Sequence, residues 1–94
     1  MLLCETEVQL SKKISIEKVE TAYEGTFVVL YADEDNKYSS EKNNKLMHIG
    51  KKDILREYEF KSSSIEFVML NPEEILVASP LEMTLIVVNL KKQR

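Results

Sequence analysis

Residues 65–90 read IEFVML-NPE-EILVA-SPLE-MTLIVVNL, three apolar segments joined by two short polar connections. In the first segment apolar residues recur at every second position, which is the period of a strand with one buried face. Pro72 and Pro80 each preset the backbone for a turn, so neither apolar run continues through its connection. The stretch therefore predicts an antiparallel meander with strands over 65–70, 74–78 and 83–90.

Upstream of this meander, residues 26–32 (TFVVLYA) predict another strand. Apolar residues occupy both of its faces, which is typical of a central strand that is covered on both sides. Residues 2–10 alternate between apolar and polar side chains and predict a half-buried strand. Residues 46–49 (LMHI) predict a short strand that ends at Gly50.

Two segments fit more than one structure. Residues 14–24 could form a helix that begins at Ser15, or they could form one arm of a hairpin that turns at Glu24-Gly25. β-Branched residues and the glycine favour the hairpin slightly, and both alternatives stay open. Residues 52–56 predict a short helical turn that runs into a strand over 57–61.

Length and composition limit the fold class. The chain has 94 residues, the size of one small domain, and 15 of them are Val or Ile, which favour strands. We expect a single domain over 1–94 with a long polar loop at 33–45 and a frayed basic end at 91–94. The predicted fold is mainly β, a small antiparallel barrel or sandwich with one or two short helices. The alternative is an α+β fold in which a helix near 15–24 covers one sheet.

Charge and cysteine content exclude several classes of protein. The 13 basic and 16 acidic residues give a net charge of -3, whereas a dedicated nucleic-acid binder usually carries a basic excess. A single cysteine excludes an internal disulfide framework and a four-cysteine zinc site. No stretch approaches the roughly 20 apolar residues of a membrane helix. We therefore expect a cytoplasmic protein that does not contact membranes.

The residues that could carry chemistry do not assemble into a known catalytic pattern. His48 is the only histidine and lies in a predicted strand, where a structural role is expected. Cys4 falls on the predicted core face of its strand. The acidic run 33–36 lacks the ligand spacing of a calcium loop, and Glu73 and Glu74 are adjacent on a turn. The sequence thus predicts a protein that is not an enzyme and has no cofactor or metal.

Elimination leaves a binding role. The sequence predicts a small protein-binding module, a regulator or inhibitor of a larger partner, as expected of a phage or mobile-element accessory protein that occupies a host target. The alternative is a β-barrel that binds a small ligand or nucleic acid through the basic region 42–56. The candidate binding residues are Tyr38, Lys42, Lys45, Lys51, Lys52, Arg56 and Tyr58.

Residues 83–90 also predict self-association. Both faces of this strand are almost wholly apolar, and a two-layer domain covers only one face of each strand. The second face would then be buried between copies of the chain, most simply across a two-fold axis. The predicted interface residues of this homo-oligomer are Thr84, Ile86, Val88 and Leu90.

Overall fold

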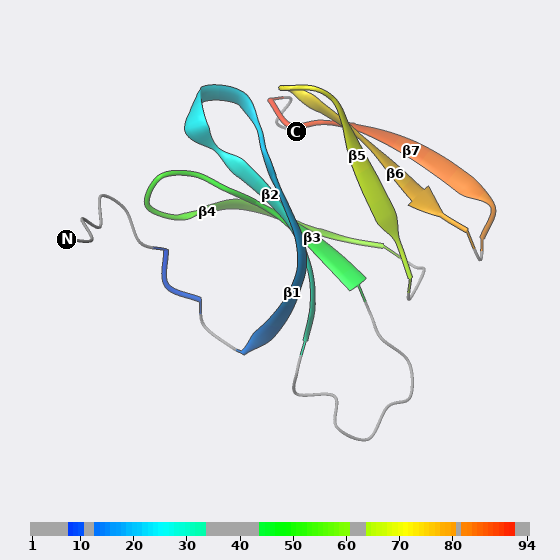
Figure 1. Ribbon diagram of the computed structural model, residues 1–94, viewed down its shortest axis with the longest axis horizontal. Coiled ribbons are helices and arrows are strands. Elements are labelled where there is room, and N and C mark those ends of the chain that lie inside the picture. Colours follow the sequence, from blue (N-terminus) through cyan, green and yellow to red (C-terminus); the bar gives the residue numbers. More distant parts are fainter. Residues whose placement is uncertain (1–7, 11–12, 34–43, 61–63, 81, 92–94) are drawn as a thin grey trace.

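The computed structural model (Figure 1) describes residues 8–10, 13–33, 44–60, 64–80 and 82–91. These residues form two antiparallel sheets that pack face to face and do not close into a barrel. Sheet A has the strand order β1-β2-β3-β4 and sheet B the order β5-β6-β7. The prediction of a mainly β domain is confirmed, and the domain is an open sandwich. The strands are β1 (Ile14–Thr21), β2 (Phe27–Asp33), β3 (Asn44–Ile49), β4 (Ile54–Glu59), β5 (Glu66–Asn71), β6 (Glu74–Ser79) and β7 (Thr84–Asn89).

The main core lies between the two sheets. Alternate residues of β2 and β3 face alternate residues of β5 and β6 across it, and Leu46, Ile75 and Val77 are fully buried. The predicted meander over 65–90 is confirmed, because β5, β6 and β7 pair in sequence order. The buried members of this core are Val28, Leu30, Leu46, Ile65, Phe67, Ile75, Val77 and Leu90.

The central strand β2 is buried on both faces, as its sequence predicts. Its second face carries Val29 and Tyr31, which form a smaller cluster with Met47 on β3. Val8 and Leu10 line an apolar groove of about 260 Å³ against Val29 and Met47. Residues 8–10 therefore lie against the face of sheet A that points away from sheet B.

Two of the uncertain segments are settled in the structure. Residues 14–24 form the hairpin arm that the sequence slightly favoured and not the alternative helix, because Ile14, Ile16, Val19 and Thr21 of the strand β1 favour extended backbone. The helical turn predicted over 52–56 is wrong. The Gly50 N–H donates to the Asp53 carbonyl at 2.8 Å, so residues 50–53 form a hairpin turn and β4 starts directly after it. Only the three-residue segment η1 (Tyr23–Gly25) is helical among the described residues.

Some predictions fall on residues outside the described part of the chain. Residues 8–10 of the predicted strand over 2–10 have no regular structure, and the remainder, with Cys4, is not described. Residues 34–43 of the predicted loop and residues 92–94 of the predicted frayed end are likewise not described. Asn44 and Lys45, at the end of the predicted loop, belong to β3.

The β1–β2 hairpin closes through a two-residue turn. Glu24 and Gly25 both have left-handed backbone, with φ of 50° and 75°, and the Thr26 N–H donates to the Tyr23 carbonyl at 3.0 Å. This is the geometry of a type I′ turn, whose backbone twist matches that of a hairpin.

The left-handed backbone of this turn can be tested by substitution. Asparagine adopts left-handed backbone more readily than glutamate, so Glu24→Asn is expected to raise the free energy of unfolding by about 0.5–1 kcal/mol. Urea denaturation of both proteins measures the difference. Gly25→Ala is the control and should lower the same free energy, because alanine resists a positive φ. A destabilised Glu24→Asn protein would contradict this description of the turn.

Candidate functional site

The surface that stands out is the face of sheet B that points away from the core. Strand register places Val68 opposite Leu76 and Leu76 opposite Val87, while Ala78 lies opposite Leu85. These residues alternate with the core residues Phe67, Ile75 and Val77, so they point to the opposite side. We call this set the outer face of sheet B. It consists of Val68, Leu76, Ala78, Leu85 and Val87.

The outer face of sheet B is apolar and exposed. Val68 is 51% exposed, Leu85 71% and Val87 57%, and Leu70 beside them is 51% exposed. Glu66 and Glu74 are charged residues at its margin, and a shallow groove of about 140 Å³ runs between Glu66, Val68 and Leu76. An antiparallel sheet with one solvated face normally carries polar side chains there. A contiguous apolar patch of this kind is typical of a protein interaction site.

Met83 lies at the corner where the polypeptide enters β7. Its side chain is 92% exposed and its φ is 56°, a left-handed conformation that costs methionine on the order of 1–2 kcal/mol. The turn is fixed by the Met83 N–H, which donates to the Pro80 carbonyl at 3.2 Å. Methionine is flexible and polarizable and is common at adaptable binding surfaces. An exposed methionine in strained backbone thus adds to the apolar surface of sheet B.

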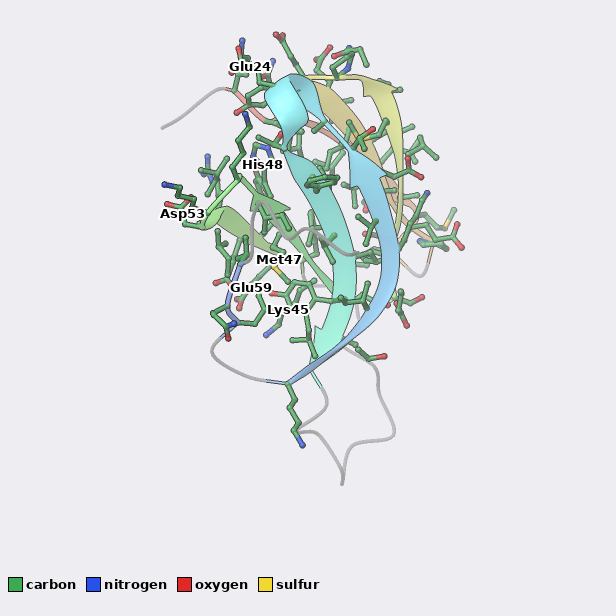
Figure 2. The ribbon with its side chains drawn as sticks, turned by 60° about the vertical axis from the view of Figure 1, so that its left-hand side comes forward. Glu24, Lys45, Met47, His48, Asp53 and Glu59 are labelled. Carbon is green, nitrogen blue, oxygen red and sulfur yellow. The ribbon has the colours of Figure 1, made fainter. Side chains whose placement is uncertain are left out.

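His48 has the environment of a structural histidine. It is 1% exposed, and its Nε2 lies 2.9 Å from the Thr26 hydroxyl oxygen. That hydroxyl donates its only proton to the Tyr23 carbonyl at 2.7 Å, so it accepts from His48 and the imidazole carries its proton on Nε2. Burial lowers the pKa of His48 and keeps the ring neutral. The ring packs against Tyr23 at 5.4 Å between centroids, beneath the β1–β2 turn that Glu24 marks in Figure 2.

The basic residues of region 42–56 do not converge on one patch. Lys45 lies on the far face of sheet A, 3.7 Å from the Glu59 carboxylate (Figure 2). Arg56 pairs with His48 in the strand register and lies over the Tyr58 ring at 5.3 Å, on the side of the main core. Lys51 and Lys52 are exposed in the turn between β3 and β4.

The other predicted binding residues add little to a nucleic-acid surface. Tyr38 and Lys42 lie outside the described residues. Tyr58 packs against the main core, and its buried hydroxyl has no hydrogen-bond partner within the described part of the chain. Burial also raises the pKa of Tyr58. A ring in this position is not available to stack on a nucleobase.

The predicted oligomer interface stays a prediction, and its residues differ in exposure, since Thr84 is exposed and Ile86 is 40% exposed. Thr84, Ile86 and Val88 pair with Ser79, Val77 and Ile75, so they lie on the inner side of sheet B. Leu90 is 5% exposed and belongs to the main core, and Val88 packs against that core. The more exposed side of β7 is the opposite one, with Leu85 and Val87.

Sequence reasoning missed the outer face as a unit. Its signal was present, because all three segments of the 65–90 meander carry apolar residues on both faces. Val68 and Leu76 share this property with residues 26–32 and 83–90.

The described residues hold no group of three side chains that could bind a metal ion. Among the same residues no helix is long and apolar enough to cross a lipid bilayer. Comparison of the chain with family models, curated proteins and solved structures finds no match. The function must therefore be argued from the geometry alone.

Proposed function

We propose that this protein is a small non-enzymatic module that binds another protein through the outer face of sheet B. The observation that carries the proposal is the exposure of Val68 on β5 and of Leu85 and Val87 on β7, on the same face and with Leu76 of β6 between Val68 and Val87. Burying one such side chain completely contributes about 1.5–3 kcal/mol, so a partner that covers several of them gains much of what association requires.

The histidine and the basic residues do not support a different role. The imidazole of His48 is buried and its Nε2 is engaged with Thr26, so it is not poised to act on a substrate. The described basic residues of region 42–56 lie on both faces of sheet A and in a turn, and this arrangement does not favour a nucleic-acid ligand. A regulator or inhibitor that acts by occupying a larger protein needs only a rigid apolar surface, which sheet B supplies.

Affinity capture tests the proposal with matched variants. Val68→Lys places a charge on the outer face, where Val68 is 51% exposed. Val19→Lys places a charge on β1, where Val19 is 50% exposed. From a lysate of the cells that make the protein, the wild type and Val19→Lys should retain the same protein. Val68→Lys should retain at least about tenfold less of it, because a charge at the centre of an interface is desolvated without a partner.

Two results would count against the proposal. Equal retention by Val68→Lys and the wild type would show that the outer face is not the binding surface. Retention that falls steeply with salt and disappears after nuclease treatment would instead identify the nucleic-acid alternative, because counterion release makes such binding salt-dependent.

A further inference from the structure

β7 differs from the other edge strands of the sandwich. Open sheet edges usually carry charged side chains that prevent pairing with another chain. β1 has Glu17, Lys18 and Glu20, β4 has Arg56, Glu57 and Glu59, and β5 has Glu66. β7 reads TLIVVN and has no charged residue. Within the described residues its one neighbouring strand is β6, and it lies at the outer margin of sheet B in Figure 1.

The backbone of β7 is oriented for a second neighbour. The Leu90 N–H donates to the Glu73 carbonyl at 2.7 Å, and Leu90 and Glu73 continue the register of β6 and β7. Successive residues of a strand direct their N–H and C=O groups to opposite sides. Ile86 and Val88 therefore bond to β6, whereas Leu85 and Val87 direct their backbone groups toward the open side.

We infer that a second copy of this chain pairs with that open edge, β7 against β7, in an antiparallel arrangement about a two-fold axis. The inference goes beyond the proposed function, because it concerns the open edge of sheet B and not its outer face. The product is a continuous six-stranded sheet whose outer face combines the exposed Leu85 and Val87 of both copies.

Symmetry restricts the register of this pairing. Residues that lie opposite each other in neighbouring strands point to the same face of a sheet. A two-fold axis between the two copies of β7 therefore passes beside one residue, which lies opposite the same residue of the other copy. With Ile86 on the axis, Leu85 of one copy lies opposite Val87 of the other, which matches exposed apolar side chains. With Val87 on the axis, Leu85 would lie opposite Asn89. The apolar match selects Ile86.

Charges at the two ends of β7 favour the same antiparallel direction. Glu82 precedes the strand, and Lys91 follows it with a half-exposed side chain that contacts Glu73 at 3.3 Å. Antiparallel pairing brings Glu82 of each copy near Lys91 of the other, whereas parallel pairing would bring like charges together. Pairing along one short strand buries less than the roughly 800 Å² per partner of a stable interface. We therefore expect a weak dimer with a dissociation constant in the micromolar range.

Sedimentation analysis of the purified full chain tests the pairing. The wild type should shift from a 10.9 kDa monomer to a dimer as its concentration rises from micromolar to millimolar. Val87→Pro removes an N–H that faces the open side, which an edge strand tolerates, and should weaken the dimer at least about tenfold. Val68 lies on β5, two strands away from this edge, so Val68→Lys should leave the dimer intact. Circular dichroism shows whether each variant folds. If Val87→Pro does not fold, Leu85→Lys replaces it as the variant expected to weaken the dimer.

Disulfide trapping tests the register. In a Cys4→Ser background, Ile86→Cys should form a covalent dimer on mild oxidation faster than Val87→Cys, because only the former brings two thiols directly opposite. The reverse order would overturn the register. A wild type that stays monomeric at millimolar concentration would overturn the self-pairing. If Val68→Lys still loses the captured protein in that case, the proposed function stands without the dimer.

Discussion

Replacing Phe67 by alanine is expected to lower the free energy of unfolding by about 3–5 kcal/mol. Phe67 is 2% exposed and points from β5 into the core between the two sheets. Its ring also lies 4.7 Å from the Lys18 ammonium, which donates to the Phe67 carbonyl at 2.6 Å. The substitution therefore opens a cavity and weakens the contact between β1 and β5. A domain of this size has a total stability of about 5–14 kcal/mol, so the loss is a large fraction of it.

Val68→Ala is the matched control for that substitution. Val68 is the next residue of β5, but it points to the outer face and is half exposed, so its truncation should cost less than about 1 kcal/mol. Chemical denaturation of the three proteins gives both differences. Equal losses at positions 67 and 68 would mean that β5 does not present alternate faces to core and solvent as described here.

The strands that sequence reasoning predicted are those with an unambiguous period or a clear turn. The meander over 65–90 is delimited by Pro72 and Pro80, and its alternation divides the residues of each strand between two faces. The strand at 26–32 was recognisable because every side chain from Phe27 to Ala32 is apolar. Local signals were sufficient in these cases because each segment is bounded by residues that end a strand.

The segments that the sequence left open or predicted wrongly depend on contacts that exist only in the folded protein. Residues 14–21 contain apolar positions that suit a helix or a strand, and pairing with β2 settles the matter in favour of the strand. A β-bulge at Glu17 shifts the register of β1, so alternation is interrupted in the sequence itself. Residues 50–53 lack a glycine pair, and the hydrogen bond from Gly50 to Asp53 that defines their turn is visible only in three dimensions.

For the candidate site, too, the sequence indicates one part of the answer and the folded structure supplies the other. The apolar character of 83–90 on both faces is a property of the sequence, and it directed attention to self-association. Which face is covered depends on how sheet B packs on sheet A, and this packing buries Leu90 and leaves Leu85 exposed. A sequence pattern with period two assigns residues to two faces, but it does not state which face is the core.

His48→Ala is expected to lower the free energy of unfolding by about 2–4 kcal/mol while the folded fraction keeps its binding activity. The substitution removes a fully buried ring that packs on Tyr23 and donates to the Thr26 hydroxyl. It therefore weakens the end of the sandwich where Tyr23 also donates to the Pro72 carbonyl at 2.9 Å, which joins the β1–β2 turn to sheet B. Capture of the partner by folded protein should stay within a few-fold of the wild type, because the outer face of sheet B is not altered.

A pH dependence distinguishes this structural role from a general loss of packing. Burial lowers the pKa of His48 in the folded state, so below about pH 6.5 the unfolded chain binds a proton that the folded protein resists. The stability of the wild type should therefore fall as the pH decreases from 7.5 to 5.5. His48→Gln keeps an N–H donor for Thr26 without a titrating group, so its stability should fall less over the same interval. Denaturation at the two pH values measures both slopes, and identical slopes would show that the folded protein does not resist protonation of His48. A His48→Ala protein that folds normally yet loses binding a hundredfold would assign His48 a functional role instead.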